Sequence, residues 1–391
     1  MKNLIIYAAS AMFALTACNA LDIIPSDSYS DPVVWQDQNL IKMYVNDQYN
    51  ALVGQDNFYR YSFFSDEVYQ KYNDEGCNYI RENILTSDNV GSVSDVLNYW
   101  NTGYGYLHKV NMFFENIESS RVDEEFKNTM INEMKFIRAF IYFRLIRSYG
   151  GVPIIKEVYD INSDWSNVKR NTYNECVEYI ISDLDDVIAN LPDRPSERNR
   201  VGANTARALK SRVLLYNASA LNNPDNDKER WQKASDAAKE LLDKGYSLCD
   251  NYREMFFDVT NNEYIFAKEF SETYSHMLGF NLTCTGDGGR GWATPSQNLV
   301  DAYETLDGEI PVLNSESGDI NPKSIYNPEK PYENRDPRFY DCIYYNGSTS
   351  LNGRIVETFK DGADMIQQDM TMTGYYCRKF VNENEPVSQS H

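Results

Sequence analysis

The strongest structural signal in the sequence is a set of apolar residues that recurs every three or four positions between residues 126 and 145. This spacing places an apolar stripe along one face of an α-helix. Asp123 can cap the start of such a helix, and the Gly150-Gly151 pair can end it. We therefore predict one long amphipathic helix between these two signals. Its stripe consists of Phe126, Met130, Met134, Ile137, Ile141 and Leu145.

A second helix is predicted from a capping box, in which Thr172 and Glu175 each satisfy a free backbone N–H of the first turn. Apolar residues at helical spacing follow from Cys176 to Leu191, and Pro192 closes the helix. Three aspartates on it could be mistaken for a catalytic carboxylate pair, but a solvated helix face is the simpler interpretation. They are Asp183, Asp185 and Asp186.

Four more helices are predicted, at about residues 37–53, 96–118, 204–220 and 229–244. The last two carry small residues at regular positions, which lets paired helices approach closely, as in tetratricopeptide-type hairpins. After about residue 246, Gly, Asn, Asp and Pro become dense and the apolar runs shorten. This change in composition predicts a loop-rich C-terminal region.

The N-terminus has the pattern of an export signal. Lys2 precedes an apolar run of twelve residues from Leu4 to Leu15, which is too short to span a bilayer. Small residues then lead to Cys18, as in a lipobox, so cleavage and lipidation are expected at this cysteine. We thus expect a signal peptide at 1–17 and a lipidated tether at 18–36. The alternative is an ordinary secretory signal with a chance cysteine.

The composition of the chain after Cys18 excludes several classes of function. Without Lys2, 36 Lys and Arg stand against 58 Asp and Glu, a net charge of −22. Nucleic acid and anionic lipid would be repelled by such a surface. The three histidines make a histidine-rich metal site or a Ser-His-Asp triad hard to assemble. His108 falls in a predicted helix, where a packing role is expected.

Several short motifs occur in order over nearly the whole chain, and together they resemble the SusD/RagB family. Its members are glycan-binding lipoproteins paired with SusC-like TonB-dependent transporters. The motifs are Leu21-Asp22 with Pro25 and Trp35; Trp100, Tyr104, Leu107 and Asn111 on one helix; Arg138-Ala139, Tyr142-Phe143 and Tyr149 to Pro153; Asp183-Leu184 before Leu191-Pro192; Ala206 to Tyr216; Pro295-Ser296, Val300 to Tyr303 and Asp307-Gly308; and Arg335 to Phe339.

The resemblance implies a mainly α fold, in which tetratricopeptide-like helical pairs form a scaffold and mostly irregular, loop-rich insertions carry the ligand site. The SusD-like domain would cover 37–391, with the scaffold at about 37–54 and 96–245. The ligand region would then lie at about 55–95 and 246–391. Family members usually continue into another helical pair, so the C-terminal helices are expected to be missing from this sequence.

The resemblance also implies a function without catalysis. The protein would be anchored to the outer membrane through Cys18, exposed at the cell surface, and would deliver oligosaccharides to a SusC-like transporter. No cofactor is expected. Ca²⁺ is conceivable with so many Asp and Asn residues, but the sequence has no EF-hand spacing.

A sugar site without catalysis needs flat aromatic faces and planar hydrogen-bonding groups on loops held by a rigid frame. The chain is rich in such faces, with 30 Tyr, 18 Phe and 5 Trp, although most of them must lie in the core. The irregular segment around residues 55–106 and the glycine-rich loop that ends at Trp292 supply both kinds of group. The predicted ligand-binding residues are Trp292, Tyr274, Tyr72, Arg81, Trp100 and Asn101.

Three other functions remain open at this point. A peptide-binding nutrient-capture lipoprotein of the same family is one, because helical-hairpin scaffolds bind peptides readily. A glycoside hydrolase is another, since abundant acidic residues could supply a carboxylate pair. The third is a structural lipoprotein that gates its transporter and holds no ligand.

Overall fold

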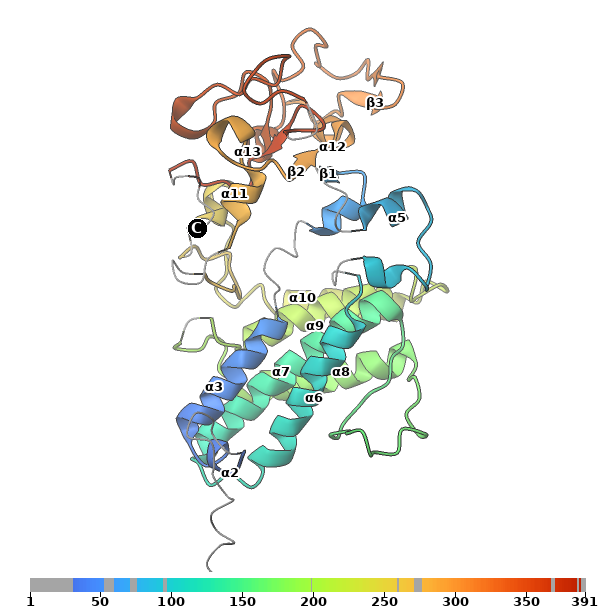
Figure 1. The fold of residues 1–391 in the computed structure, drawn as a ribbon, viewed down its shortest axis with the longest axis vertical. Coiled ribbons are helices and arrows are strands. Elements are labelled where there is room, and N and C mark those ends of the chain that lie inside the picture. The colour runs from blue at the N-terminus through green and yellow to red at the C-terminus, as the bar shows by residue number, and fades with distance from the viewer. Residues whose placement is uncertain are drawn as a thin grey trace, which may run out of the picture.

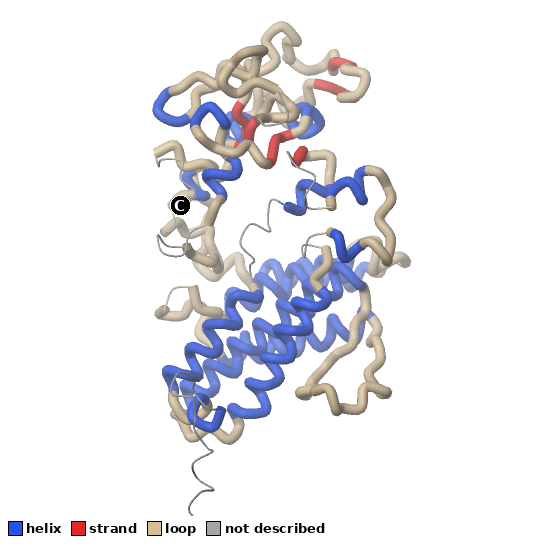
Figure 2. Tube along the Cα trace, viewed as in Figure 1, coloured by secondary structure: helices blue, strands red, loops and turns tan. Residues whose placement is uncertain are grey.

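The computed structural model describes residues 31–52, 60–70, 76–93, 97–197, 199–258, 260–270, 276–366, 370–384 and 387. Helices gather at one end of its long axis, and an irregular, loop-rich part occupies the other end (Figure 1). The short strands lie in the loop-rich part (Figure 2). The signal segment and Cys18 lie outside the described residues.

The helical part is built from long helices that pack in sequence order. α7 packs against α6 on one side and α8 on another, α9 packs against α8, and α10 against α9, while α3 lies along α7. The helices of this part are α2 (Asp31–Val34), α3 (Gln38–Gln48), α6 (Trp100–Ile117), α7 (Glu124–Tyr149), α8 (Tyr173–Asn190), α9 (Ala203–Ala218) and α10 (Lys228–Lys239).

The predicted end signals of these helices are confirmed. The Asp123 side chain accepts a hydrogen bond from the Phe126 N–H at the start of α7. Gly150 ends this helix with φ 69°, a left-handed value that glycine adopts without steric cost. Thr172 and Glu175 form the capping box of α8. Local sequence alone therefore determines where the two central helices begin and end.

The main core surrounds α7. The predicted stripe residues Met134, Ile137, Ile141 and Leu145 are fully buried. Because α3, α6 and α8 all contact α7, residues on its other faces are buried as well, such as Glu133. Each fully buried large apolar side chain contributes about 1.5–3 kcal/mol, so this helix is the main source of hydrophobic stabilisation in the helical part.

The aspartates of α8 divide between solvent and core. Asp185 and Asp186 have half-exposed side chains that pair with lysines, as expected for a solvated face. The prediction is wrong for Asp183, which is 4% exposed. Its carboxylate accepts two hydrogen bonds of 2.8 Å from the guanidinium of Arg138 on α7. A buried carboxylate is stable there because the planar fork of the arginine satisfies both oxygens.

Short elements organise the loop-rich part. β1 (Val68–Gln70) pairs antiparallel with β2 (Ala293–Pro295), which joins two segments far apart in sequence. The other ladders join β3 (Val312–Asn314) to β4 (Asp319–Ile320) and β5 (Ile343–Tyr344) to β6 (Tyr376–Cys377). The helices are α5 (Cys77–Arg81), α11 (Leu278–Leu282), α12 (Gln297–Ala302) and α13 (Pro337–Cys342), with 3₁₀ turns at Tyr61–Phe64, Val90–Ser92, Glu254–Phe256, Thr285–Asp287 and Leu351–Gly353. A further 3₁₀ turn, Tyr49–Ala51, follows α3 in the helical part.

The mainly α-helical fold predicted from the sequence is confirmed, and α12 begins at Gln297, directly after Ser296, whose side chain caps the helix. Two smaller apolar clusters, one around Phe63 and Tyr376 and one around Phe339, hold the loop-rich part together. Within the described residues, no helix combines the length and the apolar character needed to cross a bilayer.

Candidate functional site

A pocket of about 250 Å³ lies between α6 and the segment that follows α7, residues 153–168. Successive turns of α6 contribute residues three or four positions apart, with Leu107 and His108 side by side, so these residues share one broad face of the helix. We call this cavity the aromatic pocket. It is lined by Trp100, Tyr104, Leu107, His108 and Asn111 from α6, and by Pro153, Ile155, Glu157, Tyr159, Trp165 and Val168.

The wall opposite α6 is held in place through its backbone. The Tyr104 hydroxyl donates to the carbonyl of Pro153 at 2.8 Å. The Asn111 amide donates to the carbonyls of Ile155, at 3.1 Å, and Glu157, at 3.0 Å. These three carbonyls belong to alternate residues, which point the same way in an extended chain. One face of α6 therefore fixes the extended segment alongside it.

Aromatic rings form both sides of the pocket. The rings of Trp100 and Tyr104 lie 4.9 Å apart between centroids on α6, and those of Tyr159 and Trp165 lie 4.6 Å apart on the segment. Trp165 is 52% exposed, although its indole N–H donates to the carbonyl of Asp160. A half-exposed tryptophan beside a cavity offers a flat apolar face to a ligand.

Some polar groups of the pocket have hydrogen-bond partners within the protein, and others have none among the described residues. The Tyr159 hydroxyl donates to Glu157 Oε1 at 2.9 Å. Burial raises the pKa of Tyr104 well above its ordinary value, so this phenol stays protonated. Asn111 is only 1% exposed, and its Oδ1 accepts no hydrogen bond from any residue that the structure describes. A buried acceptor without a donor is costly, and a ligand that donates to it would remove this cost.

Two predicted site residues lie at the start of α6. Trp100 lines the aromatic pocket and packs edge-on against Tyr149, with ring centroids 5.2 Å apart. Asn101 is exposed on the next helical position and is not among the lining residues of the pocket. His108 also lines the pocket and is exposed, so its expected packing role is wrong.

The remaining predicted residues lie elsewhere. Arg81 is exposed at the end of α5, and its guanidinium lies 5.1 Å from the centroid of the Tyr69 ring, which is 46% exposed. This pair is separate from the aromatic pocket. Tyr72, Tyr274 and the lipidation residue Cys18 lie outside the described residues.

Trp292 lies in the loop-rich part, where it is partly buried against the cluster around Phe63 and Tyr376. The Arg290 guanidinium lies 4.4 Å from the centroid of the indole. The Trp292 N–H of the backbone donates to Asn281 at 2.7 Å, and its indole N–H has no acceptor among the described residues. The structure therefore gives Trp292 a packing contact and does not bring it to the aromatic pocket.

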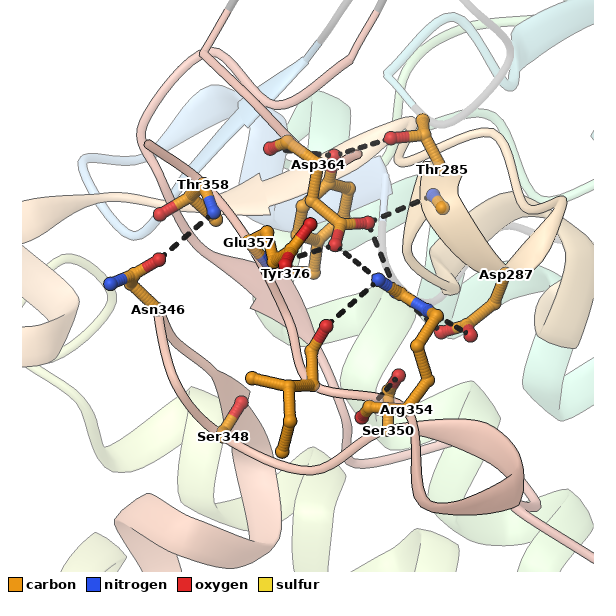
Figure 3. Close-up of polar contacts among 12 residues, drawn as sticks. Thr285, Asp287, Asn346, Ser348, Ser350, Arg354, Glu357, Thr358, Asp364 and Tyr376 are labelled. Carbon is orange, nitrogen blue, oxygen red and sulfur yellow. Dashed lines mark hydrogen bonds and ion pairs between the residues drawn. The ribbon is translucent and has the colours of Figure 1, made fainter. Parts of the chain in front are cut away.

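A buried ion cluster fixes the glycine-rich loop that leads to Trp292. Arg354 pairs with Asp287 and Asp364, each at 2.6 Å (Figure 3). Asp364 also accepts from the backbone N–H of Gly286 at 2.8 Å. A Cβ atom on Gly286 would lie 2.7 Å from Arg354 Nη1, so a larger residue here would displace the Arg354 side chain. The cluster thus ties the loop to the segment around residues 350–364.

Sequence reasoning missed most of the pocket. Tyr104 and Asn111 were recognised only as part of a family motif, and Tyr159, Glu157 and Trp165 were not noticed. Trp165 gave one usable signal, because a tryptophan inside a polar loop has no core to join.

Among the described residues, no group of three His, Cys, Asp or Glu side chains is placed to hold a metal ion.

Comparison with known proteins identifies the family. The profile described as "starch-binding associating with outer membrane", of SusD-like proteins, matches residues 21–215, and that of the SusD family matches residues 262–391. SusD-like protein P2 of Formosa agariphila is 23% identical over 296 residues, which cover 70% of this chain. The chain spans 56% of the length of that relative.

Solved structures agree with this assignment. A SusD-like protein from Bacteroides fragilis superposes with a TM-score of 0.74 at 26% identity, over 91% of this chain and 70% of that one. A SusD-like carbohydrate binding protein from the same species has a TM-score of 0.75 at 21% identity, over 92% and 70%. These matches confirm the tetratricopeptide-like helical fold. This chain belongs to the SusD/RagB family.

Proposed function

We propose that this protein is a non-catalytic, cell-surface lipoprotein that binds oligosaccharides and delivers them to a SusC-like TonB-dependent transporter. Family membership supports glycan binding, since SusD-like proteins include carbohydrate binders. The single observation that carries the proposal for this chain is the aromatic pocket, where a buried acceptor of Asn111 lies without a donor.

The chemistry of the pocket suits a sugar. One face of a pyranose ring is rich in C–H groups and packs on flat aromatic rings, which Tyr159 and Trp165 supply. The rim of the sugar carries hydroxyl groups, which can donate to Asn111 Oδ1 and to the Glu157 carboxylate. A pocket of about 250 Å³ accommodates one or two sugar units, and the remainder of an oligosaccharide would extend over its open side.

Binding is tested by titrating a panel of oligosaccharides into the protein and measuring heat or intrinsic fluorescence. Trp165→Ala is expected to weaken binding at least tenfold with only a small change in the melting temperature, because half of its surface is already exposed. Ile161→Ala is the matched control, since this side chain is 94% exposed in the same loop and does not line the pocket. Equal affinity in Trp165→Ala and the wild type would contradict this site.

The proposed location and partner need separate tests. Cys18→Ser is expected to release the protein from the membrane fraction of its host, because the acyl chains on Cys18 would be its anchor. Purification through the lipidated protein is expected to recover a SusC-like transporter. Recovery of oligosaccharide binding without any associated transporter would retain the capture role and contradict the delivery role.

A further inference from the structure

Most side-chain hydrogen-bond donors of the aromatic pocket already donate to acceptors within the protein. The Tyr104 hydroxyl and both protons of the Asn111 amide are directed to carbonyls of the 153–157 backbone. The Tyr159 hydroxyl is directed to Glu157, and the Trp165 indole N–H to Asp160. Among the lining residues, the side-chain donors that remain are the Trp100 indole and the His108 imidazole.

Several acceptors, by contrast, remain open. Asn111 Oδ1 is buried and accepts from no described residue. Glu157 uses Oε1 to accept from Tyr159, and its Oε2 accepts no hydrogen bond from the described residues. The phenol oxygens of Tyr104 and Tyr159 each donate one hydrogen bond and keep their lone pairs. The open polar groups of the pocket are therefore mainly hydrogen-bond acceptors, which favours a ligand rich in hydrogen-bond donors.

The charges around the pocket also favour a ligand without negative charge. No lysine or arginine is among its lining residues, and Glu157 is its one carboxylate. Arg170 lies 5.6 Å from the Trp100 ring centroid but donates to the carbonyl of Tyr149 at 2.9 Å. Lys156 lies over the Tyr179 ring on α8 and lines a neighbouring cavity instead. Glu157 lines both cavities, whereas Lys156 and Lys169 line only the neighbouring one, so an anionic group in the aromatic pocket would meet a carboxylate and no cation of the pocket lining.

From this arrangement we infer that the aromatic pocket selects uncharged, hydroxyl-rich sugar units and rejects units that carry a carboxylate. This inference rests on the proposed glycan-binding function and narrows its substrate class. A neutral sugar donates its hydroxyl protons to Asn111 and Glu157. A uronate places a second negative charge beside Glu157 and leaves the Asn111 acceptor unsatisfied when its carboxylate, which has no proton to donate, faces that acceptor.

The test uses pairs of oligosaccharides that differ only in the oxidation of C6. Suitable pairs are cellotetraose with the β-1,4-glucuronate tetramer, β-1,4-mannotetraose with the β-1,4-mannuronate tetramer, and α-1,4-galactotriose with the α-1,4-galacturonate trimer. Affinities are measured by isothermal titration at low and high salt. The neutral member of each pair that binds is expected to bind at least tenfold tighter, with a ratio that shrinks in high salt because charge repulsion is screened.

Two variants separate this effect from the overall acidity of the protein. Glu157→Gln removes the charge and keeps an acceptor for the Tyr159 hydroxyl, so the preference for the neutral member is expected to fall to less than threefold. Asp164→Asn removes an exposed charge in the same loop that does not line the pocket, and is expected to leave the preference unchanged.

Different outcomes overturn the selection of neutral sugar units and the binding of glycans. If a uronate binds as tightly as its neutral partner, or if Glu157→Gln leaves the ratio unchanged, the inference is overturned while glycan binding stands. If neither member of any pair binds and peptides bind instead, the proposed function is overturned together with the inference.

Discussion

Arg335 stacks on Phe339 inside the loop-rich part, with the guanidinium carbon 4.8 Å from the ring centroid. The arginine is only 1% exposed, and no described carboxylate forms an ion pair with it. It donates instead to the carbonyls of Pro331, Val300 and Tyr303. One planar cation thereby satisfies two carbonyls at the C-terminal end of α12 and a third at Pro331.

This arrangement predicts that Arg335→Lys destabilises the protein by about 2–4 kcal/mol, because an ammonium cannot reach three spread carbonyls and cannot stack on the ring. Urea unfolding measures the loss. Arg338→Lys is the matched control, since the Arg338 side chain is 60% exposed and pairs with Asp336 at the surface. Its expected cost is below about 1 kcal/mol. Equal costs in the two variants would argue against a special role for Arg335.

A second prediction concerns the ion cluster of Arg354. Arg354→Met is expected to cost about 3–5 kcal/mol, because it leaves the carboxylates of Asp287 and Asp364 buried without a cation. Denaturant unfolding of Lys360→Met, which removes an exposed cation from the same region, provides the comparison. A loss in Arg354→Met no larger than that in Lys360→Met would show that the cluster does not stabilise the loop.

The pH dependence of stability is predicted at Glu383. Burial raises the pKa of this carboxyl, but hydrogen bonds from Arg378 and Tyr344 outweigh burial and hold the pKa below its ordinary value. A carboxyl with a lowered native pKa binds fewer protons in the native state, so it stabilises the protein above about pH 5. This contribution is lost as the pH falls through the native pKa.

We therefore expect Glu383→Gln to be less stable than the wild type at pH 7 and to approach it at acidic pH. Chemical unfolding at several pH values between about 3 and 7 measures both curves. Parallel curves across this range would contradict the assignment of Glu383. A bidentate contact with Arg378, at 2.9 and 3.1 Å, holds this carboxylate near the end of the described chain.

The cysteines provide a prediction that needs no variant at first. None of the six described cysteines is in a disulfide, and Cys77, Cys176, Cys284 and Cys342 are buried. Burial raises the pKa of Cys377 to about 11 and raises that of Cys284 as well. A short pulse of iodoacetamide at pH 8 is thus expected to modify Cys249 first among these six, as read by mass spectrometry. Fast modification of Cys284 would contradict its burial.

The helices could be predicted from the sequence because their signals are local. Asp123 and Thr172 act within one turn, and the stripe from Phe126 to Leu145 needs only helical periodicity. The environment of Asp183 could not be predicted this way, since its partner Arg138 is 45 residues away. A polar residue on a helix face is solvated or paired according to which helix packs there, and spacing along one helix does not specify that.

The aromatic pocket was harder to predict from the sequence for the same reason. Trp100 was identified from its helix motif. Tyr159 and Trp165 reach the pocket only because residues 153–157 are hydrogen-bonded to residues of α6 that lie more than 40 positions earlier in the sequence. Such contacts follow neither a period of 3.6 nor a period of 2. The emphasis on Trp292 came from its glycine-rich neighbourhood, and the structure explains these glycines by different close approaches: Gly286 to Arg354, Gly289 to Thr283 and Gly291 to Tyr376.

The attachment of the 153–157 segment to α6 has a consequence for how such proteins diversify. Tyr104 and Asn111 hold carbonyl groups, which every amino acid possesses, so the attachment does not depend on which side chains the segment carries. The sequence of residues 157–168 can therefore change while the sequence of the helices stays the same. Replacing these residues would change one wall of the aromatic pocket and leave the three hydrogen bonds to α6 in place.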